Sequence, residues 1–264
     1  MGEGEVGGWQ LWIDDQPRPG WANMAIDQTL LDRAEHRGES WLRLYQWQPH
    51  CLSFGRHEPA LRRYDADRIR ELGLDTVRRP TGGRAVWHCR ELTYAVVAPV
   101  QQLGSLQVAY LEIHRMLAAA LEELGTAATL ALPAGPTSLD AGACFARAAG
   151  GEVMVAGRKI VGSAQLRRGD ALLQHGSIML EDDQAIVADL TLGTDGNHHS
   201  TPTTPLASVL GRRLGPCELV EAVARAAAFC WRGAWSRISD PGAVLGAAAM
   251  HFAQFQSPAW TWAR

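Results

Sequence analysis

The chain has 264 residues, of which 47% are hydrophobic and 20% charged, and its formal net charge is −3. This composition is typical of a globular protein with one large domain or two small ones, and it excludes collagen-like, disordered, disulfide-stapled and globally basic nucleic-acid-binding proteins. No stretch approaches about 18 uninterrupted apolar residues, and the start MGEGEVGG lacks the apolar core of a secretory signal. We therefore expect a cytoplasmic protein without a membrane span.

Six short strands and two helices are expected in the first half of the chain. The strands cover residues 10–14, 41–47, 51–55, 75–79, 85–88 and 91–100. The helices cover residues 23–37 and 64–73. Apolar residues at helical spacing indicate the first helix, and alternating apolar and polar residues indicate a strand over 41–47 with one buried face. We expect this strand to pair with 51–55, and 85–88 to pair with 91–100.

The second half is expected to hold a helix, a hairpin, a strand and two further helices. In chain order these cover residues 107–124, 152–165, 171–180, 216–231 and 242–254. The hairpin is expected to turn at Ala156 to Arg158. Hairpins with helices inserted between them predict an α+β fold with a mixed, largely antiparallel central sheet flanked by helices. We expect a single catalytic domain over 1–264, with a core over about 38–215 and a small helical part over about 216–264.

A first candidate site is the stretch RRPTGGRAVWHCRELTYAVV, which begins at Arg78. Gly82 and Gly83 carry no Cβ, so a ligand is able to approach the backbone closely. The positive charge of Arg78, Arg79 and Arg84 around this turn suits an anionic group such as a phosphate. A tight hairpin turn with solvated arginines explains the same pattern, and the residues alone leave both interpretations open.

A second candidate site is the stretch GRKIVGSAQLRRGDALLQHGSI, which begins at Gly157. Lys159 lies in a strand that otherwise carries valines and isoleucine. Such a lysine often points to water, but the small residues of Gly162-Ser163-Ala164 follow it directly and leave room for a ligand. His175 and the glycine after it form a second small-residue break beside a titratable group.

Five cysteines are scattered along the chain without any CxxC pair. They are Cys51, Cys89, Cys144, Cys217 and Cys230. This spacing excludes a zinc ribbon and makes a disulfide framework unexpected, and we predict no metal site. In a reducing compartment each cysteine is either a small buried side chain or a reactive thiol.

Three ordered motifs resemble those of the biotin/lipoate protein ligase superfamily. They are RRPTGGRAV with a following histidine and ELTY, then GRKIVGSAQ, then LQHGS. The resemblance spans most of the chain and is closest to the cysteine-dependent octanoyl-[acyl carrier protein]:protein octanoyltransferases of the lipoate-protein-ligase-like type. It implies the catalytic-domain fold of lipoate ligases and class II synthetases.

The resemblance also implies roles for individual residues. In those octanoyltransferases a Cys-Phe pair lies fifteen residues before the motif lysine, as Cys144-Phe145 lies before Lys159 here. It therefore implies that Cys144 and Lys159 are catalytic. The residues implied to bind substrate are Arg79, Thr81, Gly82, Gly83, Arg84, His88, Gly162, Ser163, Ala164, Gln165, His175 and Gly176.

The activity implied by the resemblance is octanoyl transfer in lipoate biosynthesis. The octanoyl group would pass from acyl carrier protein through a cysteine thioester to a lysine of a lipoyl-accepting protein, such as the glycine cleavage H protein. Because the donor is already a thioester, no cofactor is expected, and we expect a monomer that binds neither nucleic acid nor membrane. Three alternatives stay open: an ATP-dependent lipoate or octanoate ligase, an amidotransferase between lipoyl domains, and a non-catalytic carrier-binding relative.

Two departures from the family pattern bear on these roles. Cys89 stands where an aspartate usually follows the motif histidine. Residues 146–150 replace the Pro-Ser-aromatic stretch that normally follows the Cys-Phe pair.

Overall fold

The computed structural model describes residues 7–132, 150–181, 184–193 and 205–263. Cys144 and residues 146–149 lie outside these ranges, so the expectations for them concern residues that the structure does not describe.

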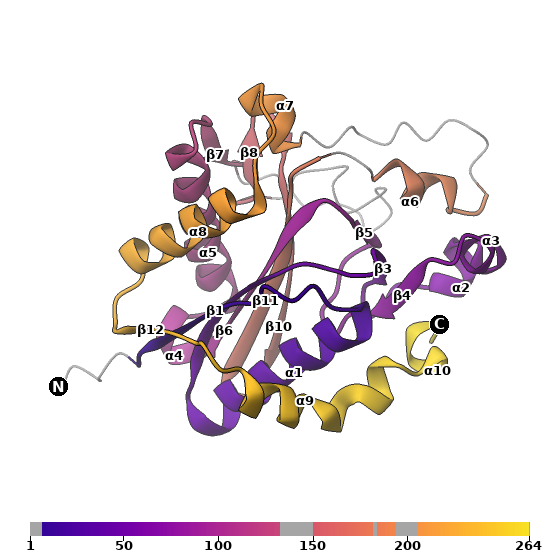
Figure 1. Cartoon of the computed structure of the whole chain (residues 1–264), viewed down its shortest axis with the longest axis horizontal. Coiled ribbons are helices and arrows are strands. Elements are labelled where there is room, and N and C mark those ends of the chain that lie inside the picture. Colours follow the sequence, from indigo (N-terminus) through magenta and orange to yellow (C-terminus); the bar gives the residue numbers. More distant parts are fainter. Residues whose placement is uncertain (1–6, 133–149, 182–183, 194–204, 264) are drawn as a thin grey trace.

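A six-stranded mixed sheet forms the centre of the molecule (Figure 1). Its strands are, in spatial order, β10 (Val161–Arg168), β11 (Ala171–Met179), β6 (Glu91–Pro99), β2 (Ser40–Tyr45), β1 (Trp9–Ile13) and β12 (Trp235–Arg237). The pairs from β10 to β2 are antiparallel, whereas β1 is parallel to both β2 and β12. The expected α+β fold with a mixed, largely antiparallel sheet is confirmed.

Helices cover both faces of this sheet (Figure 1). On one face lie α1 (Gly20–Arg37) and α9 (Gly242–Phe255), and on the other lie α5 (Leu106–Glu123) and α8 (Pro216–Cys230). Every residue of β2 is consequently buried. The expectation that this strand buries one face was wrong, because the polar residues of its second face lie under α1 and not in water.

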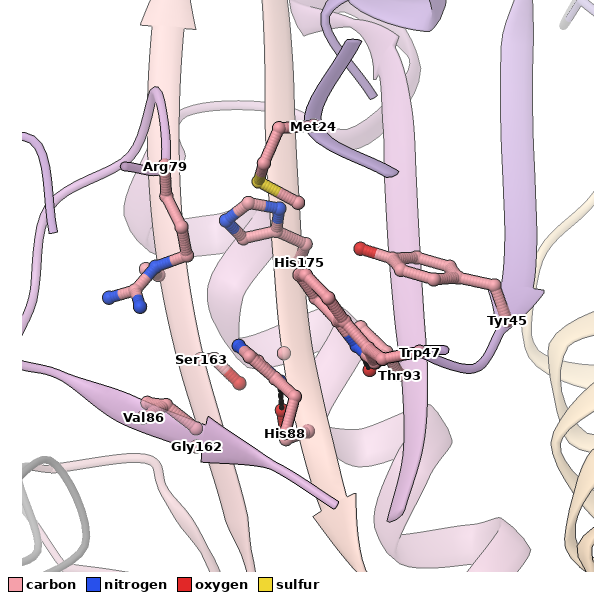
Figure 2. A pocket seen from close by; sticks show the side chains of 13 residues that line it. Met24, Tyr45, Trp47, Arg79, Val86, His88, Thr93, Gly162, Ser163 and His175 are labelled. Carbon is pink, nitrogen blue, oxygen red and sulfur yellow. Dashed lines mark hydrogen bonds between the residues drawn. The ribbon is translucent and has the colours of Figure 1, made fainter. Parts of the chain in front are cut away.

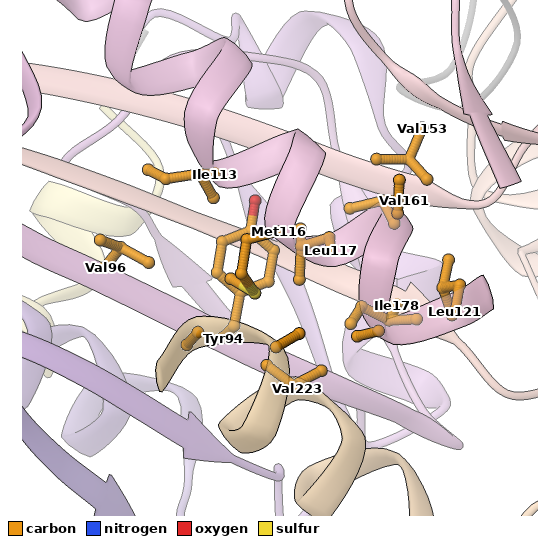
Figure 3. Close-up of a cluster of buried hydrophobic side chains, with 14 of the residues drawn as sticks. Tyr94, Val96, Ile113, Met116, Leu117, Leu121, Val153, Val161, Ile178 and Val223 are labelled. Atoms are coloured by element: carbon orange, nitrogen blue, oxygen red, sulfur yellow. The ribbon is translucent and has the colours of Figure 1, made fainter. Parts of the chain in front are cut away.

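Alternate residues of the central strands enter two separate cores. Figure 3 shows Tyr94 and Val96 of β6 packed with Ile113 and Met116 of α5 and with Val223 of α8. The intervening β6 residues face α1. Successive side chains of a strand point to opposite faces of the sheet, so one strand contributes residues to both cores.

A smaller sheet lies beside the central one. It contains β4 (Asp75–Arg78), β3 (Cys51–Phe54) and β5 (Val86–His88), with β3 in the middle. Two expected pairings were therefore wrong: β3 does not pair with β2, and β5 does not pair with β6. The reason is that β1 and β6 occupy both edges of β2, while β2 and β11 occupy both edges of β6.

A third small sheet carries the lysine hairpin. It consists of β7 (Ala128–Leu130), β8 (Val153–Val155) and β9 (Arg158–Lys159), all antiparallel. Between β8 and β9, Ala156 and Gly157 have φ values of 50° and 73°. Two successive residues in the left-handed region form the turn that suits a tight hairpin, so the expected turn position is confirmed.

The remaining helices are short. They are α2 (Ala60–Arg63), α3 (Ala66–Glu71), α4 (Val100–Leu103), α6 (Ala185–Asp189), α7 (Leu206–Leu210) and α10 (Pro258–Thr261). In the part of the chain that the structure describes, no helix has the length and apolar character needed to cross a membrane.

The C-terminal part contains the two expected helices, α8 and α9, but it also contributes a strand. β12 pairs with β1, and the ring of Trp9 in β1 stacks on Trp231 and Trp235 at centroid distances of 4.6 and 5.5 Å. Because α8 and α9 cover opposite faces of the sheet, this part completes both cores.

Candidate active site

A small cavity lies between the central sheet, α1 and the small β4-β3-β5 sheet (Figure 2). Met24 and Tyr45 at one end are buried, whereas Ala164 is partly exposed and Gly83 is exposed. A Cβ built on Gly83 would lie 4.0 Å from that of Ala164. The cavity therefore opens beside the glycine turn and is closed by α1 and β2.

Seven of the residues expected to bind substrate form part of the cavity wall. They are Arg79, His88, Gly162, Ser163, Ala164, His175 and Gly176. Sequence reasoning missed six others, Met24, Tyr45, Trp47, Val86, Thr93 and Ser177. Of the missed residues, Met24 and Tyr45 come from elements far from any of the three motifs in the sequence, and no local pattern connects them with a ligand.

The glycine turn is held in place from within the protein. The guanidinium of Arg79 donates to the carbonyl oxygens of Gly82 and Arg84 at 3.1 and 2.8 Å, and to the backbone and side-chain oxygens of Ser53 at 2.9 and 2.5 Å. Arg79 is buried. The side chain thus shapes the turn while it lines the cavity, a role that the expectation of an anion-binding arginine did not include.

Two glycines near the turn differ in what they require. A Cβ on Gly55 would lie 1.9 Å from the Gly83 carbonyl oxygen, so only glycine fits there. A Cβ on Gly82 would meet nothing within 4 Å. Packing within the protein does not demand glycine at Gly82, which is consistent with close approach of a ligand to that backbone.

Arg78 is bonded to the protein backbone. Its guanidinium is buried and donates to the carbonyl oxygens of Gly55, Arg56, Glu58, Trp260 and Thr261. It therefore ties α10 to the small sheet. The expectation that this arginine adds positive charge around the glycine turn did not include these backbone partners. Arg84 is mostly buried and lies 4.0 Å from Glu58.

His175 anchors the cavity wall to α1. Its Nδ1 lies 2.9 Å from Asp27 Oδ2 and its Nε2 lies 2.6 Å from Thr81 Oγ1. Burial lowers the pKa of His175, so the imidazole is neutral at pH 7. Because the Asp27 carboxylate accepts, Nδ1 carries the proton and Nε2 accepts from Thr81. Asp27 also accepts from Arg43 at 3.0 Å and from Tyr45 at 2.9 Å.

His88 belongs to a second buried network. Its ring stacks on Trp47, with centroids 3.9 Å apart, and its Nδ1 lies 2.7 Å from Glu91 Oε1. The same carboxylate oxygen accepts from Thr93 at 2.6 Å and from Ser177 at 2.9 Å. Most hydrogen-bonding groups in this wall are therefore paired with one another. Because these polar groups bond to one another, a wall that contains polar residues still suits an alkyl chain.

Lys159 is held by a buried carboxylate. Its Nζ donates to Glu152 Oε1 at 2.5 Å, and both side chains are less than a tenth exposed. The pairing of Lys159 with Met154 across the β8–β9 hairpin sets the direction of the lysine. Lys159 is not part of the cavity wall but lies three residues before Gly162, which is. The sequence analysis did not identify Glu152 as a site residue, although it is the first residue of the expected hairpin over 152–165.

Several expected residues act around the cavity without lining it. Thr81 bonds to His175, and the carbonyl oxygens of Gly82 and Arg84 bond to Arg79. Gln165 donates to Gln174 and to the Leu106 carbonyl, both at 2.9 Å, and lies outside the cavity.

The described cysteines differ in character. Burial raises the pKa of the Cys51 thiol well above its usual value, and the nearby Asp75 carboxylate adds to this effect. Cys51 and Cys89 are buried, whereas Cys217 and Cys230 are exposed, and none of the four is in a disulfide. Cys144 lies outside the described residues. None of the four described cysteines lines the cavity.

Comparisons with known proteins agree on one family. The model of the lipoyl protein ligase A/B catalytic domain matches residues 19–228. Octanoyltransferase LipM of Symbiobacterium thermophilum is 39% identical over 232 residues, which cover 82% of this chain and 84% of that protein. Octanoyltransferase LipM of Carboxydothermus hydrogenoformans is 42% identical over 176 residues, which cover 65% of each.

The solved structures support the fold. A putative lipoate protein ligase from T. acidophilum with bound lipoic acid aligns with a TM-score of 0.77, over 98% of this chain and 99% of that chain. Its sequence identity is 18%. At that identity the likeness concerns the fold alone.

Proposed function

The chain belongs to the lipoyl protein ligase A/B catalytic-domain family and is an octanoyltransferase of lipoate biosynthesis, and we propose that it carries the octanoyl group as a thioester on Cys144. In this proposal the donor is octanoyl-acyl carrier protein. The acceptor is a lysine of a lipoyl-accepting protein, such as the glycine cleavage H protein.

The cavity supports an octanoyl group as its occupant. It is closed by buried side chains at one end and open at the glycine turn. Burial of about six methylenes at roughly 0.8 kcal/mol each contributes about 5 kcal/mol to binding. Gly162 and Gly176 contribute no side chain to the wall, which Met24 also lines.

The observation that carries the proposal is the position of the Glu152–Lys159 pair. The pair places a buried ammonium on the strand segment that leads directly into the cavity wall. An ammonium near a cysteine favours the thiolate, and only the thiolate attacks a thioester. The same ammonium stabilises the oxyanion that forms on the carbonyl oxygen.

Two acyl transfers complete the reaction. The Cys144 thiolate attacks the donor carbonyl carbon and a new C–S bond forms. The bond from that carbon to the carrier's sulfur breaks, and the carrier leaves as a thiolate that takes up a proton. The acceptor lysine, as the neutral amine, then attacks the Cys144 thioester. The amide C–N bond forms, the C–S bond breaks, the amine loses a proton, and the thiolate is restored. Because one thioester replaces another in the first transfer, no ATP is needed.

The same proposal places the enzyme, as a monomer, in the cytoplasm.

The test is intact mass spectrometry after mixing with octanoyl-acyl carrier protein in the absence of ATP. We expect one octanoyl adduct on the wild type, mapped to Cys144 and released by hydroxylamine. Cys144→Ser should abolish transfer to the acceptor. Cys89→Ser is the matched control, because it also removes a thiol, and it should leave turnover largely intact.

Three results would overturn the proposal. One is full activity of Cys144→Ser, and another is loss of activity only in Cys89→Ser. The third is the absence of an adduct together with octanoylation of the acceptor that requires ATP.

A further inference from the structure

Behind the cavity wall runs a chain of hydrogen bonds that includes Ser163. This residue lies between Gly162 and Ala164 on β10. Its hydroxyl lies 2.7 Å from Nε2 of His114 on α5 and 2.7 Å from the Tyr94 hydroxyl on β6. Gln174 on β11 donates to the same Tyr94 hydroxyl at 3.0 Å. The chain thus joins α5 to the strands that form the cavity.

The other nitrogen of His114 reaches the lysine hairpin. Its Nδ1 lies 2.7 Å from the Gly151 carbonyl oxygen. Gly151 has a φ of 85°, and a Cβ on it would lie 2.7 Å from a methyl group of Leu111 on α5. The next residue is Glu152, the carboxylate partner of Lys159. His114 therefore touches the backbone immediately before the ion pair.

The proton positions along this chain are determined. His114 is fully buried, and burial lowers its pKa to about 4, so the ring is neutral at pH 7. The ammonium of Lys159 disfavours the charged ring further. A carbonyl oxygen only accepts, so Nδ1 donates to Gly151 and Nε2 accepts from Ser163. Tyr94 then donates to Ser163, and every group in the chain donates in one direction.

We propose that His114 is a positioning residue, which holds the Gly151–Glu152 backbone, and through it the Lys159 ammonium, at a fixed place relative to the acyl cavity. The proposal rests on the proposed function, because it assigns Lys159 a part in acyl transfer. Apolar packing between α5 and the hairpin is non-directional, whereas two hydrogen bonds from one rigid ring fix distance and angle. A displacement of about 1 Å at a reacting group costs about 10²-fold in rate.

The test compares three variants with the wild type. His114→Phe keeps a ring but loses both hydrogen bonds. In His114→Asn the amide nitrogen takes the place of Nδ1 and keeps the bond to Gly151. Thr29→Val is the matched control, because it removes a buried hydrogen bond, from Thr29 to the Ala25 carbonyl at 2.8 Å, far from the hairpin. The readouts are kcat, KM and hydrogen exchange of the amides of residues 151–160.

We expect His114→Phe to lower kcat about tenfold or more, to change KM less than about threefold, and to speed exchange over 151–160. His114→Asn should recover kcat to within about threefold of wild type and restore slow exchange. Thr29→Val should match the wild type in kcat and in exchange over that segment.

Two results would overturn the proposal. One is a His114→Phe variant with kcat and exchange like those of Thr29→Val, and the other is a loss confined to KM. If His114→Phe does not fold, His114→Gln takes its place. Its longer amide reaches the position of Nε2 towards Ser163 and loses the bond to Gly151, so normal kcat and unchanged exchange over 151–160 in it would equally refute the proposal.

The outcome is separable from that of the proposed function. A wild-type protein that forms no thioester would refute the Cys144 mechanism. Exchange over 151–160 would still decide the inference, because unchanged protection in His114→Phe shows that His114 does not hold the hairpin.

Discussion

The lysine hairpin and the acyl cavity contribute to the site in different ways. The hairpin contributes charge through one buried pair, Lys159 with Glu152. The cavity contributes shape, and its histidines and carboxylates are bonded to one another. In the proposed mechanism the first arrangement acts on the charge that develops during the reaction, whereas the second receives the octanoyl chain. Changes in the hairpin should therefore alter kcat, and changes in the cavity should alter KM and chain-length preference.

The two regions also depend on different parts of the chain. Glu152 and Lys159 are seven residues apart in one hairpin. Around the cavity, Asp27 of α1 and His175 of β11 are 148 residues apart, and Arg43 reaches Asp27 from β2. The cavity thus exists only when α1, β2 and β11 have assembled.

The largest expected effect is that of Glu152→Ala in the hairpin. It removes the carboxylate from a buried ammonium, which costs about 3–5 kcal/mol in the free energy of unfolding. We expect kcat to fall about 10²-fold, because Lys159 is no longer oriented. Denaturant unfolding and steady-state kinetics measure the two effects.

Glu123→Ala is the matched control for the hairpin pair. Glu123 pairs with Arg225 at 2.6 Å, but both side chains are about half exposed. Its loss should leave the unfolding midpoint and kcat nearly unchanged. If Glu152→Ala and Glu123→Ala changed the unfolding midpoint and kcat equally, burial of the Glu152–Lys159 pair would not be the cause of the effect.

The next effect is the pH dependence of stability. The pKa of His114 falls from 6.5 in the unfolded chain to about 4 in the folded protein, chiefly because of burial. A lowered folded pKa gives stability that is present above pH 6.5 and lost as the pH falls towards 4. By linkage this amounts to about 3 kcal/mol in the free energy of unfolding. His175, whose pKa is also lowered, adds to the loss below pH 6.5.

His114→Asn isolates the contribution of His114 to the pH dependence of stability. Urea unfolding from pH 7 to pH 4 should show a loss smaller by about 3 kcal/mol than in the wild type. The carboxyls of Asp14 and Asp32 do not confuse the result, because their lowered pKa values act below 3.8. An unchanged pH dependence would mean that His114 is not the buried neutral ring described.

The smallest effects come from two glycines of the cavity region. Gly55→Ala forces a Cβ against the Gly83 carbonyl oxygen and should cost about 1–3 kcal/mol in the free energy of unfolding. Gly82→Ala meets open space and should leave stability unchanged, while it raises KM for the octanoyl donor. Thermal unfolding and KM measurements on both variants check this. Normal KM in Gly82→Ala would place the ligand away from the turn.

Local sequence patterns predicted most of the helices and strands. The helices near residues 23–37 and 107–124 and the strand near 171–180 appear in the structure almost as expected, because periodicity and glycine stops are local signals. Strand partners were predicted poorly. β3 follows β2 and β5 precedes β6, but both edges of β2 and of β6 are already occupied, and edge occupancy depends on segments far along the chain.

The candidate site was predicted in part. Glycine spacing and small residues pointed to Gly162, Ala164 and Gly176, because a missing side chain is visible in the sequence as space. Asp27 also carried a signal, an acidic residue within the apolar stripe of its helix, but its partner His175 did not follow from that signal. The roles of Cys144 and Lys159 stay predictions until the mass-spectrometric test.

The sequence by itself determined the family, the order of the motifs and the turn that presents Lys159, since each depends on neighbouring residues. Only the tertiary structure decided that β2 is buried on both faces, that Arg78 binds backbone carbonyls, and that Met24 lines the cavity. The physical reason is that burial and hydrogen-bond partners are properties of packed surfaces. A residue's own neighbours in the chain carry no record of what will cover it.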